Sequence, residues 1–179
     1  ASDPACPGVP LKINLSLGRV PTSCGATTAQ CVGAVTRSTS DSTNRVNGAG
    51  ATGATNWPCP YGGAQRTAHQ QFLYTAADLS AMGIGKGTIE ALGFNVVSTN
   101  GVGTLRGYTI RMACVSPNIT VLSSWVLSTV QVFNPKSVTP TVGWNLHQFD
   151  QNYDYDGRSN ILIDVCWNNL SSTATNNAS

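Results

Sequence analysis

The fold class is decided by Tyr108-Thr109-Ile110-Arg111-Met112-Ala113-Cys114, in which larger apolar side chains alternate with polar or small ones. Successive side chains of a β-strand point to opposite faces, so this period of two predicts a half-buried strand. Residues 11–17 alternate in the same way. Further strands are predicted over residues 71–74, 89–98, 119–133, 144–149 and 159–167.

Between these strands the chain carries Gly, Pro, Asn and Asp, which favour turns. One segment differs: residues 76–83 have apolar side chains at helical spacing and end in a glycine, so we expect one or two helical turns there. Strands that recur every 10–15 residues predict an all-β fold, an antiparallel jelly-roll-like β-sandwich with one short helix. Its core is expected to contain Leu92, Phe94, Val96, Ile110, Met112, Ile161, Ile163 and Val165.

Composition divides the chain into three parts. Residues 1–60 form an N-terminal extension rich in Cys, Gly and Thr with one strand, residues 61–170 carry the sandwich, and residues 171–179 are a polar tail or linker. The stretch 33–56 is too poor in large apolar residues to bury much surface. It is either a long loop held by Cys31 and Cys59 or a packing surface between subunits, and the sequence leaves both interpretations open.

Only 10% of the 179 residues are charged and the net charge is +2, whereas an average domain has about 25% charged residues. The ten Lys and Arg residues are scattered, so no phosphate-binding stripe exists and nucleic acid is not expected as a partner. No apolar run reaches the ~20 residues of a membrane span, and membrane insertion is not expected either.

Six cysteines without a CxxC pair, on a chain with little charge, favour disulfides and an extracellular or cell-surface location. Six cysteines allow 15 pairings. We expect Cys114 to pair with Cys166, because both lie in predicted core strands, and the other four to pair within the extension, which the disulfides would hold in place. The disulfide candidates are Cys6, Cys24, Cys31, Cys59, Cys114 and Cys166.

Catalytic motifs are not recognisable. Glu90 is the single glutamate, no second acid lies near it in sequence, and no GxSxG elbow is present. The glycine-rich residues 83–88 do not have the spacing of a phosphate-binding loop. We therefore expect a protein that is not an enzyme and requires no cofactor.

Acidic residues gather in one place, where Asp156-Gly157 is a favoured turn pair between two predicted strands. Two interpretations stay open for this segment: a hairpin turn alone, or oxygen ligands for calcium. An EF-hand is excluded, since the twelfth position counted from Asn152 is Ile163 rather than Glu. The calcium-ligand candidates are Asp150, Asn152, Asp154 and Asp156.

Aromatic side chains suggest a second type of site. Exposed rings can stack on sugars, whereas aromatic residues at strand positions more often lie in the core. The sugar-stacking candidates are Trp57, Tyr61, Trp125 and Tyr153.

Several segments resemble a β-sandwich domain of Bacteroidota surface proteins that the type 9 secretion system exports, including gliding-motility adhesins and giant repeat proteins. The similar segments are residues 74–83, 86–96, 108–112, 132–133, 139–145 and 155–166. The resemblance covers roughly residues 60–169 and implies display on the cell surface, adhesion or assembly. It also makes Asp41-Ser42-Thr43 similar to a Bacteroidota O-glycosylation acceptor, with Ser42 as the candidate.

The sequence thus predicts a non-enzymatic extracellular structural or adhesive domain, a repeating unit or subunit of a cell-surface filament or adhesin. The expected partners are neighbouring copies or domains, with a glycan or surface receptor as a further partner. The alternative function is a carbohydrate-binding module of a secreted protein.

Overall fold

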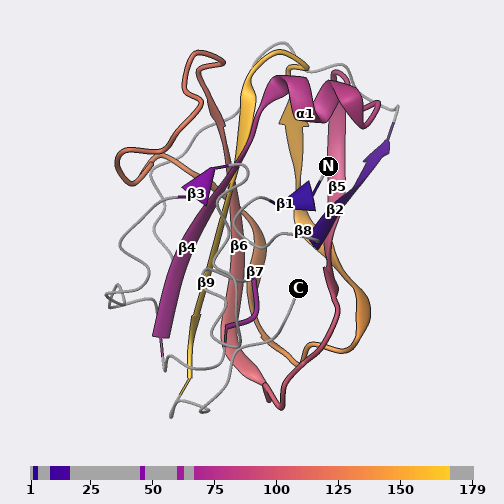
Figure 1. Ribbon diagram of the computed structural model, residues 1–179, viewed down its shortest axis with the longest axis vertical. Coiled ribbons are helices and arrows are strands. Elements are labelled where there is room, and N and C mark those ends of the chain that lie inside the picture. Colours follow the sequence, from indigo (N-terminus) through magenta and orange to yellow (C-terminus); the bar gives the residue numbers. More distant parts are fainter. Residues whose placement is uncertain (1, 4–8, 17–44, 47–59, 63–66, 170–179) are drawn as a thin grey trace.

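The computed structural model describes residues 2–3, 9–16, 45–46, 60–62 and 67–169. These residues form β-strands and one short helix, so the predicted all-β class is confirmed (Figure 1). The elements in chain order are β1 (Ser2–Asp3), β2 (Val9–Ser16), β3 (Arg45–Val46), β4 (Thr67–Tyr74), α1 (Ala76–Ala81), β5 (Gly87–Val96), β6 (Leu105–Val115), β7 (Val130–Val138), β8 (Gly143–Tyr155) and β9 (Asn160–Asn168).

The strands form two sheets, one in the order β1-β2-β5-β8 and one in the order β3-β4-β9-β6-β7. All pairs are antiparallel except β3 with β4. The chain passes from one sheet to the other between β2 and β3, β4 and β5, β5 and β6, β7 and β8, and β8 and β9. The predicted hairpin around Asp156-Gly157 is therefore wrong: the turn exists, but β8 pairs with β5 while β9 pairs with β4 and β6.

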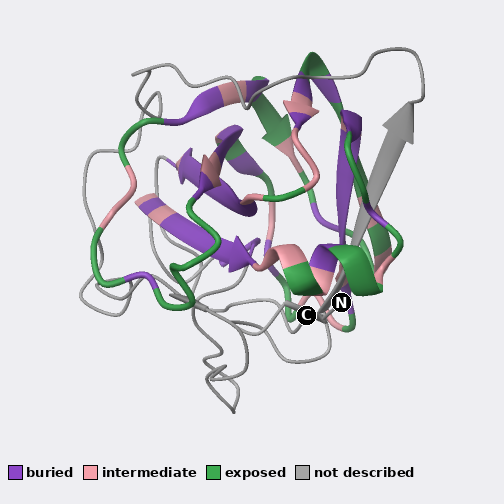
Figure 2. Ribbon diagram, turned by 90° about the horizontal axis from the view of Figure 1, so that it is seen from above, coloured by how far each residue is buried: buried purple, intermediate pink, exposed green. Residues whose placement is uncertain are grey.

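One hydrophobic core receives side chains from both sheets. Strands β4, β5, β6 and β9 are largely buried, whereas β7 and β8 carry many exposed residues (Figure 2). Burying a large aliphatic or aromatic side chain contributes roughly 1.5–3 kcal/mol, so these strand faces dominate the stability. Every core residue predicted from the sequence lies in this cluster, so that prediction is confirmed for Leu92, Phe94, Val96, Ile110, Met112, Ile161, Ile163 and Val165.

The helix α1 lies where helical spacing predicts it. Thr75 caps its N-terminus, with Oγ1 accepting from the Asp78 N–H at 3.1 Å while the Thr75 N–H donates to Asp78 Oδ2 at 3.1 Å. Leu79 is its buried residue, and Gly83 follows the helix with a φ of +77°. No helix among the described residues is long and apolar enough to cross a membrane.

The two cysteines of the described region do not pair with each other. Cys114 is disulfide-bonded, whereas Cys166 is a buried free thiol, so the predicted Cys114–Cys166 disulfide is wrong. The register explains why: Cys166 lies opposite Thr109 on β6, and Cys114 lies opposite Ile161. Five positions along a strand span roughly 17 Å, far more than the ~7 Å between Cα atoms that a disulfide tolerates. Outside the described residues lie Cys6, Cys24, Cys31 and Cys59.

Candidate functional site

Residues 116–129 join β6 to β7 as a loop without helix or strand, although a strand was predicted over residues 119–133. This loop packs on the five-stranded sheet, where it completes a second small hydrophobic cluster. The members of that cluster are Leu73, Ala113, Val115, Leu122 and Leu162, with Val126 packed against them. Structureless loops longer than about 12–15 residues are often functional, and side chains of the sheet hold this one in place.

The first anchor joins Gln71 of β4 to the loop backbone. The Gln71 side chain donates from Nε2 to the Val126 carbonyl at 2.7 Å and accepts from the Val126 N–H at 3.0 Å. The same amide nitrogen donates to Asp164 Oδ2 of β9 at 2.6 Å. Gln71 and Asp164 are both buried, and a buried polar group is costly unless it is bonded in this way.

The second anchor is an aromatic contact. His69 lies two residues before Gln71 on β4, and its Nε2 is 2.7 Å from Asp164 Oδ2. The His69 ring stacks on the Trp125 indole, with 4.3 Å between ring centroids and 25° between ring planes. The half-buried Trp125 indole therefore lies on the imidazole that contacts Asp164.

The third anchor is Arg111, whose side chain is almost fully buried at 1% exposure. Arg111 lies opposite Asp164 in the β6–β9 pair, so opposite charges face one another across neighbouring strands. Its Nε donates to Thr129 Oγ1 at 2.8 Å, and Nη2 donates to the Thr129 carbonyl at 3.3 Å. Arg111 thus holds the end of the loop.

The beginning of the loop is held by Asn160, the first residue of β9. Asn160 Nδ2 donates to the carbonyls of Ser116 and Ile119 at 3.2 and 2.7 Å. Asn160 Oδ1 accepts from the Ala76 N–H at the start of α1, at 2.7 Å. One buried amide therefore ties the loop, the helix and the sheet together.

An anchored loop would normally turn its apolar side chains inward, but three large aliphatic residues of this loop are exposed. Ile119, Val121 and Leu127 expose 40%, 65% and 64% of their surface. We call these three residues the loop patch. Polar groups on the sheet already fix the backbone of this loop. Binding of a partner to the loop patch therefore costs little conformational entropy.

A second set of exposed apolar residues lies at one end of the β5–β8 pair. Trp144 and Leu146 of β8 expose 46% and 49% of their surface. His147, the next residue of the strand, points to the other face and is buried. Val97 directly follows β5 and Val142 directly precedes β8, with 61% and 68% exposed. We call Val97, Val142, Trp144 and Leu146 the sheet patch.

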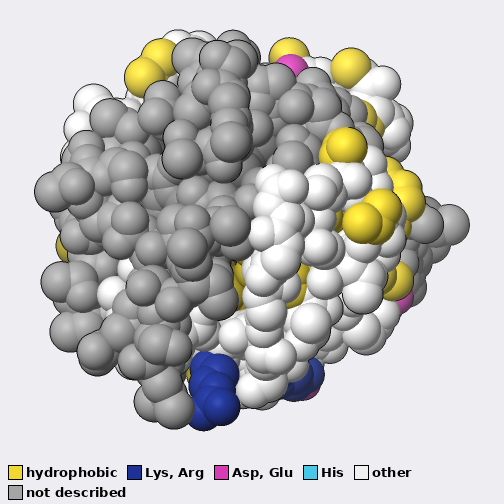
Figure 3. Space-filling view, turned by 60° about the horizontal axis from the view of Figure 1, so that its bottom comes forward, with side chains coloured by type: hydrophobic (Ala, Val, Ile, Leu, Met, Phe, Trp, Pro, Cys, Tyr) yellow, Lys and Arg dark blue, Asp and Glu magenta, His cyan; other side chains and the backbone are white. Residues whose placement is uncertain are grey.

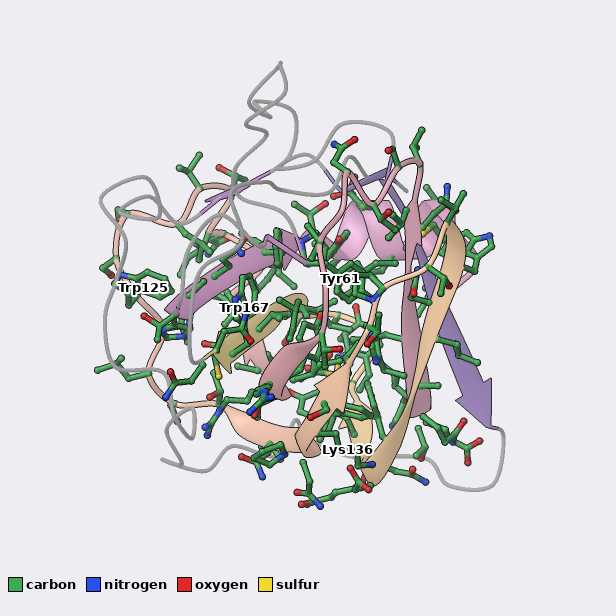
Figure 4. The ribbon with its side chains drawn as sticks, turned by 90° about the horizontal axis from the view of Figure 1, so that it is seen from below. Tyr61, Trp125, Lys136 and Trp167 are labelled. Atoms are coloured by element: carbon green, nitrogen blue, oxygen red, sulfur yellow. The ribbon has the colours of Figure 1, made fainter. Side chains whose placement is uncertain are left out.

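The sugar-stacking candidates come out differently. Tyr61 and Tyr153 are buried, at 0% and 2% exposure, which removes them from this role. Tyr61 points into the interior among Phe94, Tyr108 and His147, whereas Trp125 lies out on the loop (Figure 4). Trp57 lies outside the described residues, as does the glycan-acceptor candidate Ser42. Among the tryptophans that the structure describes, Trp144 is the exposed one, and sequence reasoning did not select it.

The calcium candidates are engaged in protein contacts. Asp150 accepts from Lys136 Nζ at 2.7 Å and from the Asn134 N–H at 2.8 Å, and these bonds hold the pKa of the Asp150 carboxyl below its usual value. Asp154 accepts from Thr88 Oγ1 at 3.0 Å, and Asn152 is exposed.

Asp156 organises the turn between β8 and β9. Its Oδ1 accepts from the Arg158 and Ser159 N–H groups at 2.9 Å, and its Oδ2 accepts from Ser159 Oγ at 2.7 Å. Burial raises the pKa of the Asp156 carboxyl, but these hydrogen bonds together have the larger effect. The pKa is therefore below its usual value. Within the described part of the chain no three His, Cys, Asp or Glu side chains are grouped to hold a metal ion, and calcium binding stays a prediction.

Another buried polar cluster lies in the main core. The Tyr61 hydroxyl is 2.6 Å from His147 Nε2, and both rings lie beside Tyr108. Burial, aided by the charge of Lys136, lowers the pKa of His147 to about 4. Burial also raises the pKa of Tyr61, so at neutral pH this pair is an uncharged part of the core.

Sequence reasoning missed the anchors, although a signal for them exists. Asp164 interrupts the apolar run Ile161-Leu162-Ile163-Asp164-Val165, and a carboxylate in a buried strand needs a partner.

Comparison with known proteins gives no match: no family model, no curated protein and no solved structure is similar to this chain.

Proposed function

We propose that this chain is a non-enzymatic structural or adhesive domain displayed outside the cell, a repeating unit or subunit of a cell-surface filament or adhesin. The observation that carries the proposal is the loop patch: Ile119, Val121 and Leu127 face solvent on a backbone held by buried Gln71 and Asn160. Exposed apolar groups on a fixed backbone favour contact with another macromolecule.

The fold supports the same role. A chain that alternates between two sheets around one core is typical of a jelly-roll-like sandwich, and we propose that architecture here. The disulfide at Cys114 supports an oxidising compartment and an extension held by a disulfide. The resemblance to Bacteroidota surface domains of the type 9 secretion system points to the same location, with Ser42 as a proposed glycan acceptor.

Surface display tests this function. Cells that lack adhesins of their own would display the full chain, and we expect cell clumping or attachment to a surface. Combined Ile119→Ser, Val121→Ser and Leu127→Ser substitutions should lower attachment several-fold at equal display. The matched control, Ser123→Ala with Ser124→Ala, changes exposed residues of the same loop and should attach like the wild type. Display without any attachment or clumping would contradict the proposal.

A carbohydrate-binding module is the second candidate, and one observation favours it. Trp144 is half exposed on a sheet face, opposite the side chain position of Asn95 in the β5–β8 register. An indole face beside an amide suits a sugar ring, whose C–H groups contact the π-surface while its hydroxyls bond to the amide. Binding on a glycan array that Trp144→Ala abolishes would favour this candidate.

A further inference from the structure

The chain contains four Asn-x-Ser/Thr sequons, the acceptor motif of N-linked glycans, and the structure separates them. They begin at Asn14, Asn118, Asn169 and Asn177. In a chain this rich in Asn, Ser and Thr chance matches are expected, so the motif alone selects none of the four. A glycan is bulky and hydrophilic, and its acceptor is therefore an exposed asparagine on a surface loop.

Asn169, which directly follows β9, does not meet this requirement. It is buried, with 6% of its surface exposed, and its Oδ1 accepts from the Arg106 N–H at 2.7 Å. To carry a glycan, Asn169 would have to leave this buried position. Asn14 lies within β2, opposite Ala91 of β5, and so on a strand rather than on a loop. Asn177 lies outside the described residues.

Asn118 does meet the requirement. Asn118, Ile119 and Thr120 are all exposed, so the whole sequon faces solvent. They lie near the start of the loop 116–129, just after β6. No described residue is hydrogen-bonded to the Asn118 side chain, so its amide nitrogen is available for reaction.

The backbone around Asn118 is fixed in a tight turn. The Ile119 N–H donates to the Ser116 carbonyl at 3.0 Å, and Pro117 occupies the second position of this turn, which suits its fixed φ. Asn160 Nδ2 donates to the carbonyls at both ends of the turn, at 3.2 Å for Ser116 and 2.7 Å for Ile119. The sheet therefore holds the backbone of the turn, while Asn118 at its third position stays exposed.

We propose that Asn118 of the folded chain is the acceptor of an N-linked glycan, an inference that rests on the export proposed above and not on adhesion. Asn118 Nδ2 attacks the anomeric carbon of an oligosaccharide carried on a lipid pyrophosphate. A nitrogen–carbon bond forms, the bond from that carbon to the phosphate oxygen breaks, and lipid pyrophosphate leaves with the electron pair while Nδ2 loses one proton. Thr120 supplies the hydroxyl that completes the sequon.

The disulfide and the surface composition agree with this modification. The disulfide at Cys114 supports passage through an oxidising compartment, which exported chains enter. Figure 3 shows one face of the molecule, where few Lys, Arg, Asp or Glu side chains appear among the described residues. A glycan would add a strongly hydrated group to a surface that has few ions.

The test compares the folded and the unfolded chain as substrates. The full chain, purified without glycans, is incubated with a lipid-linked oligosaccharide and an oligosaccharyltransferase that reads Asn-x-Ser/Thr. Peptide mass spectrometry then measures the occupancy of each sequon. The folded chain should be modified at Asn118 and at least several-fold less at Asn169. After reduction and unfolding both should be modified, because the fold alone separates them.

Variants of the hydroxyl residue are the matched controls. Thr120→Ala removes the hydroxyl and should abolish modification of Asn118, whereas Thr120→Ser keeps it and should retain the modification. Both substitutions change an exposed side chain, so melting temperatures close to that of the wild type are expected and establish that the variants are folded.

Three outcomes would overturn the proposal: equal modification of Asn118 and Asn169 in the folded chain, modification of Asn118 only after unfolding, or none at Asn118 in either state. Adhesion is read separately, because Asn118→Gln removes the glycan and keeps the loop patch. Attachment of cells that display this variant therefore reports on the proposed function whether or not Asn118 is an acceptor.

Discussion

The Gln71 side chain pairs with the Val126 backbone as a neighbouring strand would, donating to its carbonyl at 2.7 Å and accepting from its N–H at 3.0 Å. The second N–H of the same amide donates to buried Asp164 at 2.6 Å. The Gln71 side chain thus takes the place of a strand partner for Val126 and holds this part of the loop against the sheet.

We expect Gln71→Ala to lower the free energy of unfolding by about 2–4 kcal/mol, because it leaves buried backbone and carboxylate groups without a partner. Hydrogen exchange at the Val126 amide should accelerate more than exchange in β9. Gln131→Ala is the matched control: its amide bonds exposed Asn134, and its loss should cost less than about 0.5 kcal/mol. Equal losses for the two variants would show that Gln71 does not anchor the loop.

His147 should make stability depend on pH in mildly acidic solution. Its pKa is about 4 in the fold and 6.5 when unfolded, so the unfolded chain binds the proton first. Stability is therefore complete above about pH 6.5 and falls as the pH drops toward 4, by about 3 kcal/mol in total. Denaturant unfolding at pH 7.0 and pH 4.5 measures this difference.

His147→Gln keeps a polar side chain that does not titrate, so the variant should lose less stability than the wild type between these two pH values. The acids Asp150 and Asp156 have lowered pKa values and act only below about pH 4, outside this window. A variant that loses as much stability as the wild type would exclude His147 as the cause.

The sequence predicted the core well where apolar side chains alternate regularly, as along β6 and β9, because burial of one face fixes such strands. The strand predicted over residues 119–133 begins with Ile119, Thr120 and Val121, which are β-branched and favour strands. The structure has a loop there instead, because Gln71 and Asn160, which are distant in sequence, bond to its backbone. No local sequence pattern reveals these hydrogen bonds.

The candidate sites were hard to predict because the sequence does not show which strands pair or in which register. On β8 the apolar Trp144 and Leu146 face solvent while His147 faces the core, the opposite of what hydrophobicity favours. Tyr153 lies on the same strand but on its buried side. Which face is outside depends on pairing with β5, and the Cys114–Cys166 error likewise came from the unknown register of β6 and β9.

The two described cysteines should react differently with alkylating reagents. Cys166 is a buried free thiol, so it should stay unlabelled in the native protein and become labelled once the chain is unfolded without reductant. Cys114 should become labelled only after reduction, because it is disulfide-bonded. Peptide mass spectrometry reads both sites, and a peptide linking Cys114 to Cys166 would contradict the structure.

Removal of the Cys114 disulfide should lower the stability of the fold more than removal of the Cys166 thiol. Cys114→Ser is expected to lower the free energy of unfolding by about 2–5 kcal/mol. Cys166→Ala keeps a small apolar side chain in the same buried place and should cost clearly less, about 1 kcal/mol. Comparable losses in thermal unfolding would argue that the Cys114 bridge contributes little.

Gly157 should tolerate no side chain, for two separate reasons. Its φ of +75° is unfavourable for other residues, and a Cβ there would lie 2.6 Å from the backbone nitrogen of Lys86. Gly107 shares the first problem but not the second, since its φ is +64° and nothing lies within 4 Å of a Cβ built there. Gly107→Ala should therefore cost about 1 kcal/mol from backbone strain alone.

Gly157→Ala should cost about 3 kcal/mol or more, because the β8–β9 turn must move away from the segment before β5. Urea unfolding of the two variants measures the difference, and equal costs would mean that the turn does not pack closely on Lys86.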